Sequence, residues 1–280
     1  MSVYIIRRLL LFVPTLFFVS VAIFFLMRVV PGDIAEILAT ESGTLSREAE
    51  EQAIRQIRKE LDLDRPIVYQ YMKWLEGAVV GDFGQSYWEK RPVTDIILER
   101  FPRSVELAIL TVILALIWAV PLGVISAVRQ NTWADYLVRL ISISGLSLPL
   151  FLTGVLILYF LVRWFQWAPP LEYMDFFEAP GQNLMHLIWP ALAQAFYISA
   201  PITRLTRSQM LDVIREDYVR TARAKGLTEL VVIYRHALRN ALLPVVTFIG
   251  WWGGRLLGGL VIMELLFGVP GLGTGLIDSL

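Results

Sequence analysis

The amino-acid sequence predicts an all-α protein that crosses a membrane several times. Hydrophobic residues make up 56% of its 280 residues and charged residues only 18%, whereas a typical soluble domain holds about 45–50% and about 25%, respectively. Several apolar runs also reach the roughly 20 residues that a membrane-spanning helix needs. The stretches between these runs differ in charge, as expected of segments on opposite sides of a membrane.

The composition excludes several other classes of protein. The chain has no cysteine, which excludes a disulfide scaffold, a thiolate zinc site and a cysteine nucleophile. Its 25 basic and 25 acidic residues cancel, which argues against a general nucleic-acid binder. The two histidines, His186 and His236, leave little for a histidine metal cluster. We therefore expect no metal site and no cofactor bound by this chain.

Five membrane spans are expected. The first, Leu9–Val30, is longer than the apolar core of a signal peptide, about 7–15 residues, and the helix-stopping residues Pro31-Gly32-Asp33 follow it. We interpret it as a retained helix. The other four spans are Val105–Val128, Leu140–Val162, Leu184–Ile202 and Ala241–Phe267. Pro121 and Pro149 are expected to kink the second and third spans.

The placement of charges orients these spans. The stretch Gln166–Asn183 carries acidic residues but no lysine or arginine, whereas Arg204–Arg239 is rich in arginine. The positive-inside rule places the second stretch, and with it the N-terminus, in the cytoplasm. The expected organisation is an N-terminus and first transmembrane helix in 1–30, an extracytoplasmic insertion in 31–102, and a transmembrane core in 103–280 with a cytoplasmic loop at 204–240.

The insertion is expected to be a small helical piece. From Glu48 to Leu63 apolar residues recur at helical spacing, and Tyr69–Val79 suggest a second helix near the membrane surface. Two roles, which are compatible, stay open for it: a lid packed on the spans, or a docking surface for an external partner.

The cytoplasmic loop contains the most informative pattern in the sequence. Ser208–Leu227 is expected to form one amphipathic helix that ends at Gly226, a residue suited to a left-handed cap. Thr228 is placed to cap a second helix, Glu229–Arg239. Two short helices of this kind suit a groove on a partner protein. The alternative is an ordinary amphipathic loop on the membrane surface.

The same loop carries the motif of a known family. Arg220-Thr221-Ala222-Arg223-Ala224-Lys225-Gly226-Leu227, followed by His236-Ala237-Leu238-Arg239-Asn240-Ala241-Leu242-Leu243-Pro244, closely resembles the signature loop of ABC importer permeases of the dipeptide, oligopeptide and nickel branch. Four further stretches look like the same branch: Pro31-Gly32-Asp33, Leu63-Asp64-Arg65-Pro66, Gly81-Asp82-Phe83-Gly84-Gln85-Ser86-Tyr87 and Phe267-Gly268-Val269-Pro270-Gly271-Leu272-Gly273. Arg220 and Thr221 depart from the Glu-Ala of the wider superfamily, so no glutamate role transfers to Arg220.

This resemblance implies a non-catalytic pore subunit in the plasma (inner) membrane of a bacterium or archaeon. It implies two ATP-binding cassette subunits that bind ATP and Mg, a second permease that is expected to differ from this chain, and an extracytoplasmic substrate-binding protein. The chain has no Walker lysine motif of its own. The residues expected to contact an ATPase subunit are Asp217, Tyr218, Arg220, Thr221, Ala222, Arg223, Ala224, Lys225, Gly226 and Leu227.

The resemblance also bears on the C-terminus. Permeases of this branch have a sixth span after the Pro-Gly-Leu-Gly stretch at 270–273, but this chain stops at Leu280. We expect Leu280 to be a point of truncation.

Two sets of residues inside the fifth span are candidates for function. Gly250, Gly254 and Gly258 recur at every fourth position, which allows close helix approach; they pack either within this chain or along the seam with a partner permease. Arg255 lies where an unpaired charge is costly. One interpretation is that Arg255 faces a translocation cavity with Trp251 and Glu264 and attracts a peptide carboxylate there. The alternative is that it pairs with Glu106, with Glu264 of another chain, or with a carbonyl. For Trp251, simple packing is the favoured alternative.

The cargo is expected to be a di- or oligopeptide. A nickel chelate or an oligosaccharide would fit the same kind of permease. An ion-driven secondary transporter would need inverted repeats and acidic residues at mid-membrane, and an intramembrane hydrolase would need a catalytic constellation at that depth; neither pattern is visible.

Overall fold

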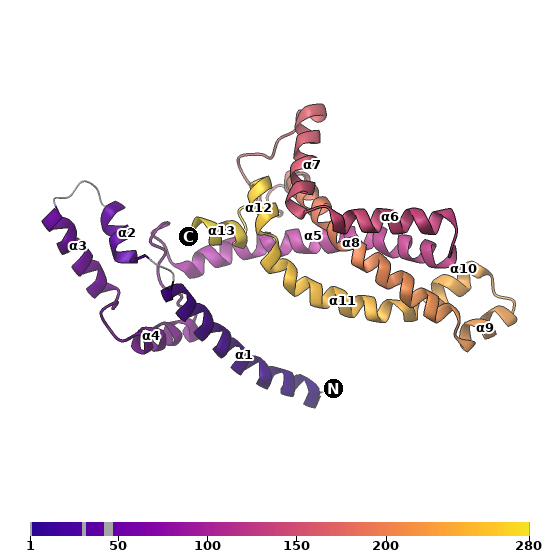
Figure 1. Ribbon diagram of the computed structural model, residues 1–280, viewed down its shortest axis with the longest axis horizontal. Helices are drawn as coiled ribbons and strands as arrows, with labels where there is room; N and C mark the ends of the chain where they lie inside the picture. Colours follow the sequence, from indigo (N-terminus) through magenta and orange to yellow (C-terminus); the bar gives the residue numbers. More distant parts are fainter. Residues whose placement is uncertain (1, 30–31, 42–46, 280) are drawn as a thin grey trace. The chain divides into compact units, whose positions relative to one another are not determined.

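The computed structural model describes residues 2–29, 32–41 and 47–279, and these residues are predominantly helical (Figure 1). Val30 and Pro31, at the expected end of the first span, and Leu280 lie outside the described residues. The chain divides into two compact units, Met1–Ile96 and Ile97–Leu280. Each unit is described separately below.

The first unit begins with α1 (Ser2–Val29), whose window of highest hydropathy has no side chain buried within the chain. In the described part of this unit, α1 is followed by the shorter helices α2 (Ile34–Glu41), α3 (Arg47–Glu60) and α4 (Ile67–Val80). The sequence predicts α3 and α4 but not α2. Tyr71 of α4 is buried, and its hydroxyl lies 2.9 Å from the Ser20 hydroxyl of α1.

Asp33 explains why a helix restarts directly after the helix-stopping residues. Its Oδ1 accepts a hydrogen bond of 2.9 Å from the Ala35 N–H at the start of α2, and its Oδ2 pairs with Arg58 of α3. Partial burial acts to raise the pKa of this carboxyl, but the hydrogen bonds from Ala35 and Arg58 and the charge of Arg58 outweigh it, so the pKa is lowered. Asp33 therefore both caps α2 and ties it to α3.

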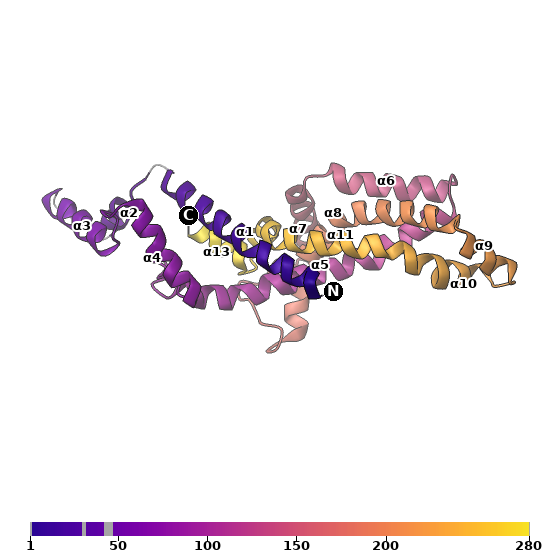
Figure 2. The same ribbon diagram turned by 90° about the horizontal axis from the view of Figure 1, so that it is seen from below.

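The second unit continues along α5, which begins just before it. The helices are α5 (Val93–Val128), α6 (Trp133–Ser147), α7 (Leu150–Phe165), α8 (Pro180–Ile214), α9 (Asp217–Ala224), α10 (Glu229–Val231), the π-helix η1 (Val232–Ala237), α11 (Leu238–Gly259), α12 (Val261–Phe267) and α13 (Leu272–Asp278). In Figures 1 and 2, α6, α8 and α11 run side by side, α7 lies across their direction while still contacting α8, and α9 and α10 form one end of the unit.

The expected third span is not one kinked helix. Helices α6 and α7 meet at an angle of 101°. Leu148 is extended (φ −85°, ψ 127°) before Pro149, because proline disfavours the helical conformation in the residue that precedes it and supplies no N–H. By contrast, Pro121 lies within α5, which the structure describes as one continuous helix.

Within the described residues, Val3–Val29 and Val93–Val128 qualify as membrane spans by length and hydropathy alone, and up to four spans result if each bent helix pair is counted as one. The second bent pair, Glu229–Leu256 with Val261–Phe267, turns by 60° and covers the expected fifth span. The expected fourth span lies in α8, which buries polar side chains such as His186 and Gln194 against protein. This helix is long enough to cross a membrane but is less apolar.

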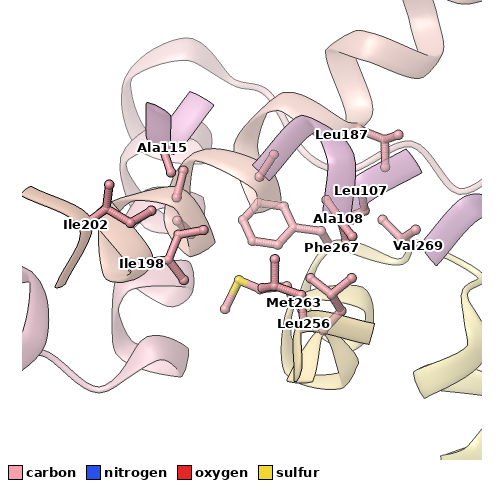
Figure 3. Packing of buried hydrophobic residues seen from close by; sticks show 14 of the residues in the cluster. Leu107, Ala108, Ala115, Leu187, Ile198, Ile202, Leu256, Met263, Phe267 and Val269 are labelled. Carbon is pink, nitrogen blue, oxygen red and sulfur yellow. The ribbon is translucent and has the colours of Figure 1, made fainter. Parts of the chain in front are cut away.

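The core of the second unit lies where α5, α8, α11 and α12 meet. Figure 3 shows the Phe267 ring surrounded by aliphatic side chains from the other three helices. Alanines and glycines allow the helices to approach closely: a Cβ added at Gly123 of α5 would lie 2.6 Å from the Thr206 side chain of α8. The sequence therefore builds a packed helical platform, and the chain between α8 and α11 extends beyond it.

Candidate functional site

Residues 216–237, here called the knob, connect α8 to α11. The sequence predicts one helix across 208–227, and this is wrong: α8 ends at Ile214 and α9 begins at Asp217. The two segments bury their apolar residues in different places. Met210 of α8 packs in a cluster with Val124 and Ala237, whereas Val219 of α9 packs against Val232. The chain turns at Glu216 so that both sets are buried.

Helix α9 is fixed firmly to the rest of the knob. Val219 and Val232 are fully buried, and Ala222 is buried in the same cluster. The Tyr218 hydroxyl accepts a hydrogen bond of 2.7 Å from the Asn240 amide at the start of α11. Ala222 therefore packs inside the knob and does not offer its side chain to a partner.

The turn between α9 and α10 depends on Gly226. This glycine has φ +77°, and its N–H donates to the Arg223 carbonyl at 2.9 Å. An ion pair of 2.8 Å between Arg223 and Glu229 spans the turn. The left-handed conformation of Gly226 confirms the predicted helix end. Thr228 starts the second helix with its backbone, but its side chain makes no capping hydrogen bond.

Gly226→Ala is expected to destabilise the folded knob by about 1–2 kcal/mol, because an L-residue is strained in the left-handed region. No atom lies within 4 Å of a Cβ added there, so the cost comes from the backbone and not from a clash. Gly226→Asn should cost less, since asparagine tolerates this conformation. Gly181→Ala is the matched control, because Gly181 also has open space but no positive φ. Hydrogen exchange of the knob amides in the three purified variants measures the effect; equal protection in Gly226→Ala and Gly181→Ala would contradict it.

The outer surface of the knob combines predicted and unpredicted residues. Asp217, Arg220, Thr221, Ala224, Lys225 and Leu227 are exposed, and Arg223 is half-buried. Leu230 and Tyr234 are also exposed, by 69% and 57%, and were missed by the sequence analysis. The sequence did contain a signal for these two residues. The short helix carries apolar residues on both of its sides, but only one side can be buried. The knob thus presents exposed apolar side chains next to arginine and lysine.

An ion pair with a buried carboxylate, also missed from sequence, lies on the part of α8 that leads to the knob. Asp135 of α6 is fully buried and accepts two hydrogen bonds of 2.9 Å from the Arg207 guanidinium of α8. Ser126 of α5 and the Asn131 N–H donate to the same carboxylate, at 2.5 and 3.0 Å. One side chain therefore holds three helices together. An acid in the first turn of an apolar helix was the available signal.

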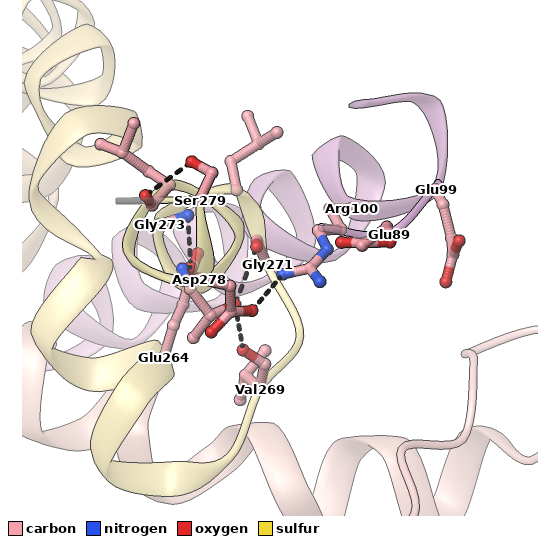
Figure 4. A network of polar contacts seen from close by, with 12 residues as sticks. Glu89, Glu99, Arg100, Glu264, Val269, Gly271, Gly273, Asp278 and Ser279 are labelled. Carbon is pink, nitrogen blue, oxygen red and sulfur yellow. Dashed lines mark hydrogen bonds and ion pairs between the residues drawn. The ribbon is translucent and has the colours of Figure 1, made fainter. Parts of the chain in front are cut away.

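Glu264 organises the C-terminal loop. It is almost completely buried and accepts hydrogen bonds from the Ser104 hydroxyl (2.6 Å), the Gly273 N–H (2.7 Å) and the Thr274 N–H (3.1 Å). Figure 4 shows the carboxylate beneath the turn that contains Gly271 and Gly273. Glu264 thus anchors the C-terminal loop and does not lie beside Arg255.

The other candidates of the fifth span lie on α11. A Cβ added at Gly250, Gly254 or Gly258 would meet no atom of the described chain within 4 Å. The Arg255 guanidinium lies 5.9 Å from the ring of Trp251 and 5.5 Å from that of Trp252. Arg255 and Trp252 line a pocket of about 390 Å³, whereas Trp251 is not among its lining residues.

Comparisons with known proteins agree with this architecture. Residues 119–280 match the family "Binding-protein-dependent transport system inner membrane component", and residues 1–108 match its N-terminal family. The chain is 40% identical, over 276 residues, to the "Glutathione transport system permease protein GsiC" of Escherichia coli K12 and of Shigella dysenteriae, covering 99% of this chain and 86% of each relative.

A solved structure is similar in fold. It is described as "Crystal structure of an amino acid ABC transporter with histidines", shares 15% identity and a TM-score of 0.50, and the match covers 67% of this chain and 79% of that one. Two family matches and a relative that aligns with nearly the whole chain give the same answer. This chain is an inner-membrane permease component of a binding-protein-dependent ABC importer, in the peptide and nickel branch of that family.

Proposed function

We propose that this chain forms half of the translocation pathway of an ATP-driven importer of di- or oligopeptides. The observation that carries this cargo is the 40% identity to permeases of glutathione transport systems over 99% of the chain, because glutathione is itself a tripeptide. A nickel chelate or an oligosaccharide is the competing cargo for the same pathway.

In this proposal the knob is the coupling element that docks in a cleft of an ATPase subunit. Its exposed Leu230 and Tyr234 supply apolar contacts, and the buried packing of Val219 on Val232 keeps its shape. ATP and Mg bind to the two ATPase subunits. Because α8 enters the knob and α11 leaves it, a movement of the knob displaces two helices of the pathway, and ATP binding thereby favours one of their two arrangements.

The second permease packs along the glycine face of α11 in this proposal. Gly250, Gly254 and Gly258 have open space around them in this chain, which is the space that a closely packed partner helix would need. A different permease is expected there, making a heterodimer. By the positive-inside rule the N-terminus and the knob lie in the cytoplasm, and residues 31–102 form the outer insertion, facing the substrate-binding protein.

The test is uptake by proteoliposomes that hold the complete importer with its binding protein. Labelled glutathione and tri-alanine are offered as peptides, and a nickel–histidine complex and maltotriose as the competing cargoes. The expected result is uptake of at least one peptide, only when ATP is supplied. Uptake of a competing cargo alone would overturn the peptide assignment, and peptide uptake without ATP would favour a secondary transporter.

A further inference from the structure

The pocket beside Arg255 has the composition of a binding site for an anion on an apolar body. Leucines and Pro149 from the break between α6 and α7 form one wall, Gln194 and Tyr197 of α8 a second, and Trp252 and Arg255 of α11 a third. Among the ten described residues that line the pocket, Arg255 alone is charged. The pocket is therefore positive, and its walls are otherwise apolar or neutral.

Arg255 has no acidic partner in the part of the chain that the structure describes. Its contacts are the two indole rings, at 5.9 and 5.5 Å. Cation–π contacts hold a guanidinium in place without neutralising it. An arginine inside a membrane span faces a water-filled cavity or a counter-charge, because a charge facing lipid is costly. The counter-charge is available from whatever enters the pocket.

Gln194 supplies an independent sign of a missing ligand. Its side chain is only 4% exposed, and its Oε1 accepts no hydrogen bond from the described residues. A buried amide oxygen without a donor costs free energy. Because Gln194 lines the pocket, an N–H group of a bound molecule would satisfy it.

The start of α7 adds a second positive feature to the same wall. Helix α7 begins at Leu150, which lines the pocket, and no side chain caps its first turn. The first backbone hydrogen bond at this end of α7 runs from the Thr153 N–H to the Pro149 carbonyl. The backbone N–H groups of the residues that precede Thr153 in this turn therefore remain available to bind an anion, as at other helix N-termini.

We infer that this pocket binds peptide cargo by a free carboxylate, which pairs with Arg255 near the start of α7, while Gln194 Oε1 accepts an N–H of the peptide. The inference rests on the proposed function and deepens it: the permease itself selects for a carboxylate, in addition to any selection by the binding protein. The apolar walls contact the rest of the peptide without distinguishing its side chains.

The test measures binding to the assembled importer in nanodiscs, without the binding protein, so that only the permeases offer a peptide site. Tri-alanine and its C-terminal amide are compared by equilibrium dialysis. The wild type should bind tri-alanine about 10- to 100-fold more tightly than the amide, as expected for the loss of a charge-assisted hydrogen bond. Arg255→Gln should bind both equally weakly, and Arg255→Lys should keep part of the preference.

Arg163→Gln is the matched control, because it makes the same change at an exposed arginine of the same unit outside the pocket. Equal binding of the two probes by the wild type, no binding of either, or a preference that survives in Arg255→Gln would overturn the inference. An uptake measurement distinguishes failure of this inference from failure of the proposed function. If binding depends on the carboxylate but no ATP-driven peptide uptake occurs, the pocket assignment stands and the proposed function is overturned. Peptide uptake that Arg255→Gln leaves unchanged overturns the pocket alone.

Discussion

Leu230→Asp is expected to abolish ATP-dependent uptake by the reconstituted importer. Leu230 is 69% exposed on the knob, so the substitution leaves the core untouched. In the proposed complex it places a carboxylate in an apolar cleft of the ATPase subunit. Loss of a central apolar contact costs about 2 kcal/mol or more at protein interfaces, which corresponds to roughly 30-fold in affinity. Co-purification of the ATPase subunits in mild detergent, measured beside uptake, tests this.

Leu171→Asp is the control for this prediction. Leu171 is likewise exposed, but it lies in the stretch Gln166–Asn183, which the charge pattern predicts to be on the opposite side of the membrane. The importer that carries Leu171→Asp should retain the ATPase subunits. Retention of these subunits and of uptake by Leu230→Asp would show that the exposed face of the knob is not a docking surface.

Removing the carboxylate of Asp135 is expected to cause the largest loss of stability in the chain. Asp135→Leu removes the buried carboxylate from Arg207, whose side chain is 21% exposed, and from Arg139, which lies 3.4 Å from the same carboxylate. Breaking a buried pair in this way costs up to about 3–5 kcal/mol. The double substitution Asp135→Leu with Arg207→Leu should be less harmful than the single one, because the partly buried charge of Arg207 is removed together with its partner. Thermal unfolding of the purified importer, followed by the circular dichroism of its helices, provides the measurement.

An exposed ion pair supplies the comparison. Asp217 and Arg220 of α9 pair at 3.1 Å, with side chains 94% and 73% exposed, and such pairs contribute about 0–1 kcal/mol. Asp217→Asn should therefore leave the unfolding temperature nearly unchanged. If Asp135→Leu were as mild as Asp217→Asn, or if the double variant were less stable than the single one, the stabilising role of the buried pair would be disproved.

Local patterns in the sequence were sufficient for much of the fold. Helical spacing predicted α3 and α4, and Gly226 marked a helix end, because amphipathic periodicity and left-handed glycine are decided by a few neighbouring residues. The composition alone predicted the membrane class. These features hardly depend on which distant segments pack together.

The features that the sequence analysis missed depend on tertiary packing. The break between α8 and α9 follows from two clusters that bury Met210 and Val219 against different segments. The pairing of Asp135 with Arg207 joins residues 72 positions apart. Glu264 looked like a partner for the cavity because it is an acid in a span, but the loop after α12 folds back over it. Spacing along one helix carries no information about such contacts.

The most direct test of the coupling role is a site-specific cross-link from the knob. Because the chain has no cysteine, Leu230→Cys introduces a single reactive thiol in this subunit, and Leu171→Cys serves as the control. Each variant, in the complete importer, is treated with a short thiol-to-amine cross-linker, and the products are identified by mass spectrometry. We expect Leu230→Cys to be joined to the subunit that carries the Walker motif, and Leu171→Cys not to be. An assembled, transporting complex in which Leu230→Cys labels only lipid-facing or permease segments, and never the ATPase, would contradict the coupling role of the knob.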